Sequence, residues 1–140
     1  MLKVEDISRS YGAVRALKGL SLSLESGGVL GFLGPNGAGK STAMKIITGF
    51  LAADAGRVEV DGLEVHDNPI ATRRVTGWMP EQVPLYDEME VGAYLRFVAE
   101  ARGVKGAEIF KRVDACAERV EIRPMLRRPI SDLSRGYRQR

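Results

Sequence analysis

The chain is poor in cysteine and histidine, with one of each among its 140 residues, Cys116 and His66. A single cysteine excludes an intrachain disulfide and a multi-cysteine metal site, and it agrees with a reducing compartment. We expect Cys116 to be a small buried side chain on a helix. We expect His66 to lie exposed beside a hairpin rather than in a catalytic site.

Long apolar runs are also missing. No stretch approaches the roughly 20 apolar residues that a membrane-spanning helix needs, and acids occupy positions 5 and 6, where a signal peptide would be apolar. The hydrophobic fraction of 44% and the charged fraction of 28% are typical of a soluble globular protein. We therefore expect a single cytoplasmic domain that does not itself cross a membrane.

Net positive charge is confined to one segment. The net charge is +3, but residues 123–140 carry six arginines against the single acid Asp132, and the rest of the chain is net negative. A nucleic-acid-binding surface would need basic residues gathered on one face of the whole domain. We therefore expect no nucleic-acid partner. We expect the arginines to lie at a solvated helix start and to pair with acids elsewhere in the chain or in sequence missing from it.

The most informative feature present is a glycine-rich stretch between an apolar run and a predicted helix. It consists of Gly34, Pro35, Asn36, Gly37, Ala38, Gly39, Lys40, Ser41 and Thr42. The apolar run Val29–Leu33 before it predicts a strand buried on both faces, and the pattern after it predicts a helix over about 40–48. Three glycines let successive backbone N–H groups turn toward one anion, and the helix adds its positive end. The alternative is a glycine-rich turn that merely joins a strand to a helix.

This spacing is the phosphate-binding loop known as Walker A, and each polar side chain in it has a chemical task. Lys40 is expected to reach the β- and γ-phosphates of a nucleotide, and Ser41 to bind a Mg²⁺ ion that bridges them. Thr42 is expected to offer a hydroxyl or an N–H group to the α-phosphate. The sequence therefore predicts nucleotide binding.

Apolar periodicity predicts the remaining elements of the first half. Alternation predicts a pair of strands around residues 2–7 and 20–24, and a hairpin over 57–65 with a tight turn at Asp61-Gly62. Asn68-Pro69 opens a short helix to about Arg74, and Val75–Met79 is predicted to be another strand.

From Glu90 onward the apolar period becomes helical. A first helix carries Val91, Tyr94, Leu95 and Val98, and a second one beyond Gly103 carries Ile109, Val113, Cys116 or Ala117, and Val120. We expect these stripes to be core rather than a ligand site. The segment 123–129, with two prolines, is expected to be an irregular connection.

Three further motifs accompany the phosphate-binding loop. Tyr11 stands in Ser10-Tyr11-Gly12, Gln82 follows Met79-Pro80-Glu81, and the chain ends in Leu133-Ser134-Arg135-Gly136-Tyr137-Arg138-Gln139-Arg140. Together they resemble the ATP-binding subunit of ABC transporters, with a leaning toward bacterial exporters, and the resemblance covers the whole chain. The family's signature is usually Leu-Ser-Gly-Gly-Gln, so Ser134 and Gly136 match while Arg135 and Tyr137 depart.

The resemblance implies a role for each matched residue. Tyr11 would stack on adenine, although by itself it could simply pack on the sheet. Gln82 would touch Mg²⁺ or the attacking water and sense the membrane partner. Ser134 and Gly136 would contact the γ-phosphate held by a second subunit, with Ser134 either capping a helix or acting as a ligand.

The resemblance also implies the architecture and the partners. The fold class would be α/β, a P-loop NTPase core with an antiparallel β subdomain and a helical subdomain insertion, incomplete at the C-terminus. The core would span about 1–89, the helical subdomain about 90–133 and the signature 133–140. ATP and Mg²⁺ would be the cofactors. The partners would be a second ATP-binding subunit, arranged head to tail, and transmembrane permease domains at the inner face of the cell membrane.

In this family an aspartate that holds Mg²⁺, a catalytic glutamate and a switch histidine follow the signature, and none of them follows Arg140 here. We therefore assign no catalytic residue, interpret the chain as an N-terminal fragment of an ATPase, and expect the 140 residues alone to be inactive. Two alternatives stay open. One is a soluble ABC-type ATPase without a membrane partner, and the other is a nucleotide-binding module that does not hydrolyse.

Overall fold

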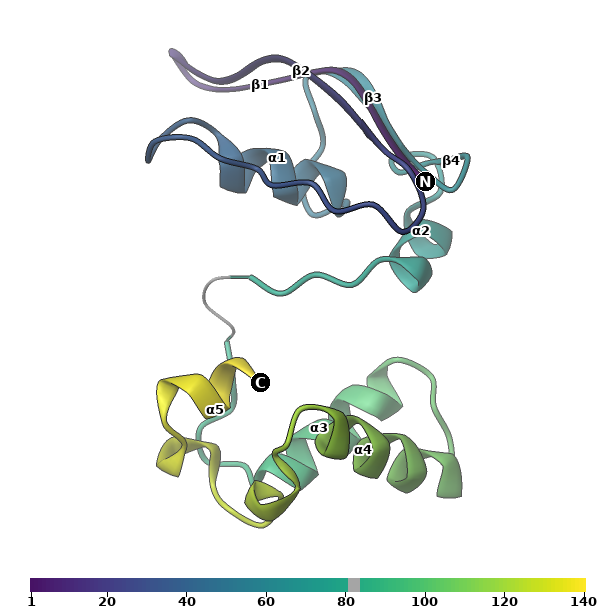
Figure 1. Cartoon of the computed structure of the whole chain (residues 1–140), viewed down its shortest axis with the longest axis vertical. Coiled ribbons are helices and arrows are strands. Elements are labelled where there is room, and N and C mark those ends of the chain that lie inside the picture. The colour runs from purple at the N-terminus through teal and green to yellow at the C-terminus, as the bar shows by residue number, and fades with distance from the viewer. Residues whose placement is uncertain (81–83) are drawn as a thin grey trace. The chain divides into compact units, whose positions relative to one another are not determined.

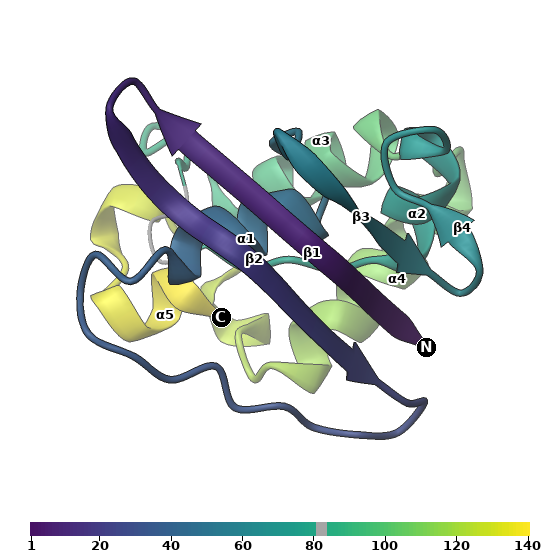
Figure 2. The ribbon, with the colours of Figure 1, turned by 90° about the horizontal axis from the view of Figure 1, so that it is seen from above.

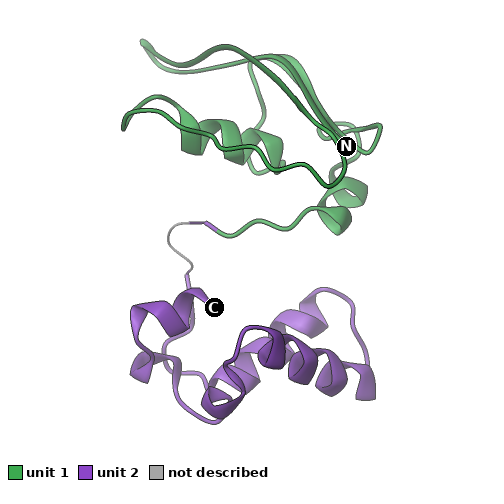
Figure 3. Ribbon diagram, in the orientation of Figure 1, with its two compact units in different colours: residues 1–79 green, residues 80–140 purple. Residues whose placement is uncertain are grey.

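The computed structural model describes residues 1–80 and 84–140. They divide into two compact units, Met1–Met79 and Pro80–Arg140, coloured separately in Figure 3. The first unit combines an antiparallel sheet with two helices, and the second contains only helices among its described residues (Figure 1). Each unit has a hydrophobic core of its own.

The sheet of the first unit has four strands in the order β2-β1-β3-β4, all antiparallel (Figure 2). They are β1 (Leu2–Tyr11), β2 (Val14–Leu24), β3 (Ala55–Val60) and β4 (Leu63–Glu64). Both predicted strand pairs are confirmed, and the second one turns at Asp61 and Gly62, which both have positive φ. Alternating apolar residues thus place one face of this sheet against the core.

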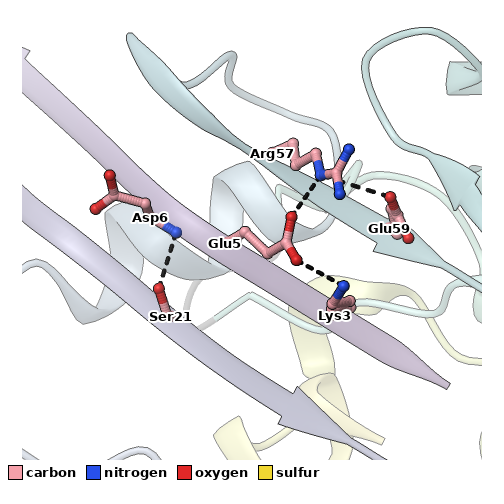
Figure 4. A network of polar contacts seen from close by, with 6 residues as sticks. All are labelled: Lys3, Glu5, Asp6, Ser21, Arg57 and Glu59. Atoms are coloured by element: carbon pink, nitrogen blue, oxygen red, sulfur yellow. Dashed lines mark hydrogen bonds and ion pairs between the residues drawn. The ribbon is translucent and has the colours of Figure 1, made fainter.

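A bulge in β1 interrupts its pairing between Val4 and Ile7. Asp6 has a φ of 49°, and its N–H donates to the Ser21 hydroxyl at 2.9 Å instead of to a strand carbonyl (Figure 4). On the other side of the bulge, a Cβ on Gly56 would lie 2.4 Å from the carbonyl oxygens of Glu5 and Asp6. Only glycine fits there, so the bulge in β1 depends on a glycine at the facing position of β3.

An ion-pair network crosses the exposed face of this sheet (Figure 4). The Glu5 carboxylate accepts hydrogen bonds from Lys3 on its own strand, at 2.6 Å, and from Arg57 on β3. Arg57 also lies 3.6 Å from Glu59. Lys3 first and Arg57 second hold the pKa of Glu5 below its ordinary value, because both cations favour the ionised carboxylate.

Helix α1 (Lys40–Ile47) packs on the sheet through Ala43 and Ile46. The buried core of this unit comprises Val4, Ile7, Leu17, Ala43, Ile46, Val58 and Val65. Helix α2 (Pro69–Val75) follows β4, as the sequence predicts. Its buried Thr72 donates its hydroxyl hydrogen to the Asn68 carbonyl at 2.9 Å.

Two predicted strands are wrong. Val29–Leu33 forms no strand, with Val29 97% and Leu33 93% exposed, although Phe32 packs against the core. Val75 ends α2, and the residues that follow it up to Met79 form no strand either. A strand exists only when its backbone groups are paired, and within 1–80 and 84–140 no strand pairs with either segment. Apolar composition favours a buried strand, but it does not supply a partner strand to pair with.

The stretch after α2 is tied to the end of α1 by an aromatic contact. The rings of Trp78 and Phe50 meet edge to face, with their centroids 4.5 Å apart. Arg73 of α2 donates to the Gly49 carbonyl at 2.6 Å, close to the same point. The end of α1 is thus joined to α2 and to the segment that follows it.

The second unit packs α3 (Val91–Ala101) against α4 (Ala107–Arg119). Short 3₁₀ turns at Arg123–Met125 and Ile130–Asp132 lead to α5 (Arg135–Gln139). Buried Ile109, Val113 and Ala117 confirm the predicted stripe on α4. Among the described residues, no helix is both long and apolar enough to cross a membrane.

Of the two alternatives Cys116 and Ala117, Ala117 is the buried one, so the separate expectation of a buried Cys116 is wrong, and the prediction for Val120 is wrong because it is exposed. Consecutive residues on a helix point about 100° apart, so Ala117, which is buried, excludes Cys116 from the core. Val120 is the C-cap of α4, and the chain leaves the helix there through Glu121, whose φ is 57°. Ile122 takes the buried place instead.

The segment before α3 is hydrogen-bonded to the segment before α5. The Ser131 N–H donates to the Asp87 carbonyl at 3.0 Å, and the Ile130 N–H donates to the Met89 carbonyl at 2.9 Å. Glu90 and Pro129 form an isolated antiparallel bridge beside these bonds. Two stretches about 40 residues apart in the sequence therefore run together.

Candidate phosphate-binding site

The glycine-rich segment forms an irregular loop that leads directly into α1. The Ala38 N–H donates to the Pro35 carbonyl at 3.3 Å, which closes a turn. Gly37 and Gly39 have φ values of 83° and 84°, in the left-handed region that other residues rarely adopt. The loop therefore needs glycine at these two positions.

Gly39 is also held against the sheet. A Cβ at this position would lie 2.3 Å from the Ala16 carbonyl oxygen and 2.8 Å from a methyl group of Leu17, both on β2. Around Gly37, by contrast, nothing lies within 4 Å of the corresponding point. The end of the loop is thus fixed on β2, whereas its middle is open.

Lys40 folds back over the loop from the first position of α1. Its ammonium group donates to the carbonyl oxygens of Gly34 and Pro35, both at 2.6 Å. A lysine has three donors, so one remains after these two bonds. The positive charge is therefore kept above the loop, where a phosphate would need it.

The first turn of α1 presents backbone donors and hydroxyl groups. The first helical bond runs from the Ala43 N–H to the Gly39 carbonyl at 2.8 Å, so the N–H groups of Lys40, Ser41 and Thr42 have no partner within the helix. Ser41 is exposed and Thr42 is half-buried. No acid lies in this turn to compete with an anion.

Tyr11 ends β1 at the turn of the first hairpin, where it pairs with Val14 and is 49% exposed. The hairpin turn and the start of α1 lie toward the same side of the first unit in Figures 1 and 2. The contact of Gly39 with Ala16, two residues beyond Val14, explains this arrangement. The structure thus brings the predicted adenine residue and the phosphate-binding loop to one end of the unit.

Ser134 and Gly136 belong to the second unit. Ser134 is the N-cap of α5, and its hydroxyl oxygen accepts the Tyr137 N–H at 3.5 Å. The predicted cap is confirmed, while the predicted role of Ser134 as a ligand stays a prediction. Leu133 and Tyr137 are partly buried against the core of this unit, so the departure at Tyr137 has a packing role.

Ion pairs hold the arginine-rich end of the chain. Arg138 pairs with Asp87 at 3.0 Å and Arg140 with Glu121 at 3.5 Å. Arg123 pairs with Asp114 and Glu118 on α4. For these three arginines the predicted pairing with acids is confirmed. Gln82 lies outside the described residues.

Sequence reasoning missed two residues beside Tyr11, Arg9 and Asp54, which contact one another. The position of Arg9 could have been predicted, because residues two apart on a strand share a face and Arg9 lies two residues before Tyr11. The contact of Asp54 could not have been predicted from local sequence, since Asp54 lies 45 residues further along the chain than Arg9.

A glycine loop closed by a lysine, at the start of a helix packed on a sheet, defines a phosphate-binding protein of the P-loop class. Comparison with known families narrows this class. The sequence model of the ABC transporter family matches residues 17–140. The chain therefore belongs to the ABC transporter family, in its ATP-binding domain.

Individual relatives agree with the family. The chain is 38% identical over 139 residues to sn-glycerol-3-phosphate import ATP-binding protein UgpC 3 of Rhizobium johnstonii, covering 99% of this chain and 40% of the relative. It is 32% identical to linearmycin resistance ATP-binding protein LnrL of Bacillus subtilis, covering 100% of this chain and 45% of the relative. The chain thus spans less than half the length of these curated relatives.

Solved structures give the same fold. An ATP-binding subunit of an ABC transporter superposes with a TM-score of 0.83 at 30% identity, covering 99% of this chain and 58% of that one. The ADP conformation of MJ1267, an ATP-binding cassette, superposes with a TM-score of 0.77 at 29% identity, covering 98% and 60%. The predicted fold class, an α/β P-loop NTPase with an antiparallel sheet and helices, is confirmed.

Proposed function

We propose that this chain is the nucleotide-binding part of an ABC transporter subunit that couples the binding and hydrolysis of ATP to transport across a membrane. The observation that carries the proposal is the loop of residues 34–39, with the Lys40 ammonium held over it by two hydrogen bonds of 2.6 Å. A cation fixed above free N–H groups at a helix start is the arrangement that a triphosphate requires.

The described residues fit a magnesium nucleotide. Mg²⁺ usually takes one or two protein oxygens together with phosphate oxygens and waters, and the exposed Ser41 hydroxyl at the first turn of α1 supplies one such oxygen. We propose Gln82 as the other ligand. When bound, the ion would neutralise charge on the phosphates. Lys40 would offer its remaining N–H donor, and the amides of Ser41 and Thr42 would orient the phosphate chain.

The partners follow as proposals from the same family. Ser134 and Gly136 would serve the nucleotide bound to a second ATP-binding subunit, arranged head to tail, while permease domains would hold both subunits at the inner face of the membrane. Residues 1–140 would then be part of one ATP-binding domain that includes both units. Relatives of import and resistance types both match, so no direction of transport is proposed.

The experiment is a titration of the whole protein with ATP and Mg²⁺ by calorimetry, followed by an assay of phosphate release with and without the membrane partner. Saturable binding, and hydrolysis that rises with the partner present, are expected. Binding without hydrolysis in the whole protein would favour the alternative of a non-hydrolysing module. Hydrolysis that no membrane protein alters would favour a soluble ATPase.

A further inference from the structure

Near the end of β1, Arg9 contacts both Asp54, which lies just before β3, and the ring of Tyr11. We propose that Arg9 and Asp54 are positioning residues that hold the Tyr11 ring so that a nucleobase can stack on one of its faces only. The inference rests on the proposed function, in which Tyr11 receives the base.

Asp54 is the fixed point of the group, because both of its carboxylate oxygens are used. One oxygen accepts a hydrogen bond from the Arg9 guanidinium at 2.6 Å, and the other accepts the backbone N–H of Ser10 at 2.7 Å. The Asp54 N–H in turn donates to the Ser8 carbonyl at 2.8 Å. The residues on both sides of Arg9 are thus tied to a single aspartate just before β3.

Arg9 links Asp54 to the Tyr11 ring. Its guanidinium carbon lies over the Tyr11 ring, 5.5 Å from the centroid, which is within the range of a cation–π contact. The Arg9 side chain is only 26% exposed, although it carries a charge. A cation on this face leaves the other face of the ring for a base.

A second observation agrees with a role for Arg9 beyond its pairing with Asp54. Its Nε is buried and has no hydrogen-bond partner within residues 1–80 and 84–140. Leaving a buried donor unsatisfied is unfavourable, so an arginine that served only to pair with Asp54 would be poorly placed. The contact with the Tyr11 ring accounts for the position of the guanidinium.

The test separates the contribution of the base from that of the phosphates. In the whole protein, the Kd of inorganic tripolyphosphate is divided by the Kd of ATP, both with Mg²⁺, and this ratio measures the gain due to the nucleoside. Arg9→Ala is expected to lower the ratio by roughly 3- to 30-fold while the Kd of tripolyphosphate stays unchanged. Tyr11→Ala should lower it by at least as much, and adding Arg9→Ala to it should change it no further.

Two more variants test the mechanism. Arg9→Lys keeps the charge but loses the planar fork, so it should recover part of the ratio, and Asp54→Asn should lower it because the anchor is weakened. The control is Arg15→Ala, which removes an exposed arginine that pairs with Ser10 across the hairpin. It should leave the ratio unchanged. Thermal denaturation confirms that each variant is folded.

Three outcomes would overturn the inference. An unchanged Kd for both compounds in Arg9→Ala would mean that the arginine does not act through the base. An equal loss of ATP and tripolyphosphate affinity would mean that it only supports the fold. If the unmodified protein bound neither compound, the proposed function would fail along with the inference, whereas the first two outcomes would leave nucleotide binding intact.

Discussion

Gly39 lies so close to Ala16 that a Cβ on the glycine would meet the alanine carbonyl oxygen at 2.3 Å. This approach joins the start of α1 to β2, and so fixes the phosphate-binding loop relative to the hairpin that carries Tyr11. Both the backbone conformation and the space at position 39 exclude a side chain.

Gly39→Ala is therefore expected to be more destabilising than Gly37→Ala. Both residues have positive φ, which alone costs about 1–2 kcal/mol for alanine. Only Gly39 adds a clash with the β2 backbone, for a further loss of about 1–3 kcal/mol. Urea denaturation of the two variants measures the difference. Equal losses of unfolding free energy would contradict the importance of the contact with β2.

Lys40→Ala is expected to weaken ATP binding by roughly 10- to 150-fold, because it removes charge-assisted hydrogen bonds to the phosphates. The matched control is Lys45→Ala, which removes an exposed lysine from the last turn of the same helix. Calorimetric titration with ATP gives both values. A similar loss in the control would show that the effect comes from net charge and not from the loop.

Ser41→Ala is expected to reduce the Mg²⁺ dependence of ATP binding. One protein ligand of the ion is lost, so affinity with Mg²⁺ should fall about tenfold while affinity in excess chelator should change little. Ser41→Thr keeps the hydroxyl and should restore the dependence. The prediction fails if the alanine variant loses equal affinity with and without Mg²⁺.

Glu5→Gln should destabilise the protein at neutral pH and matter less in acid. The pKa of Glu5 is lowered in the folded state, so its contribution is present above the unfolded value of about 4.3 and is lost as the pH falls through the lower folded value. Because the ion pairs of Glu5 are exposed, we expect a small effect on the free energy of unfolding. Denaturation midpoints of the wild type and the variant from pH 7 to pH 3 should converge. If the two midpoints stay equally far apart from pH 7 to pH 3, the ion pairs of Glu5 do not contribute to stability.

Ser134→Ala should reduce nucleotide-dependent association of two ATP-binding subunits, because Ser134 caps α5 and is proposed to contact the partner's nucleotide. Sedimentation of the whole protein with ATP and Mg²⁺ measures the dimer fraction. Ser131→Ala removes a neighbouring exposed hydroxyl and serves as the control. Equal dimer fractions for the two variants would refute the role of Ser134.

Local signals in the sequence predicted most of the fold. The period of two in β1 and β2, the Asp61-Gly62 turn and the helical spacing of α3 and α4 each depend on residues a few positions apart. The phosphate-binding loop was predictable for the same reason, because its glycines and Lys40 form one continuous motif.

The errors concern relationships that no local pattern contains. Val29–Leu33 has the composition of a buried strand, but pairing needs a neighbour, and the described residues provide none. The contact between Arg9 and Asp54 crosses 45 positions of sequence. The helical period alone does not separate Cys116 from Ala117, and it is Ala117 that fills the buried position.

The pairing of residues 87–90 with 129–131 has a mechanical consequence. The Asp87 carbonyl oxygen accepts a hydrogen bond from the Ser131 N–H, and its carboxylate pairs with the Arg138 guanidinium. Asp87 therefore contacts both α5 and the chain just before it. Ser134 lies in the sequence between Ser131 and Arg138, the two residues that Asp87 contacts. A displacement of residues 87–90 would therefore also displace the backbone before α5 and the helix itself, and Ser134 with them.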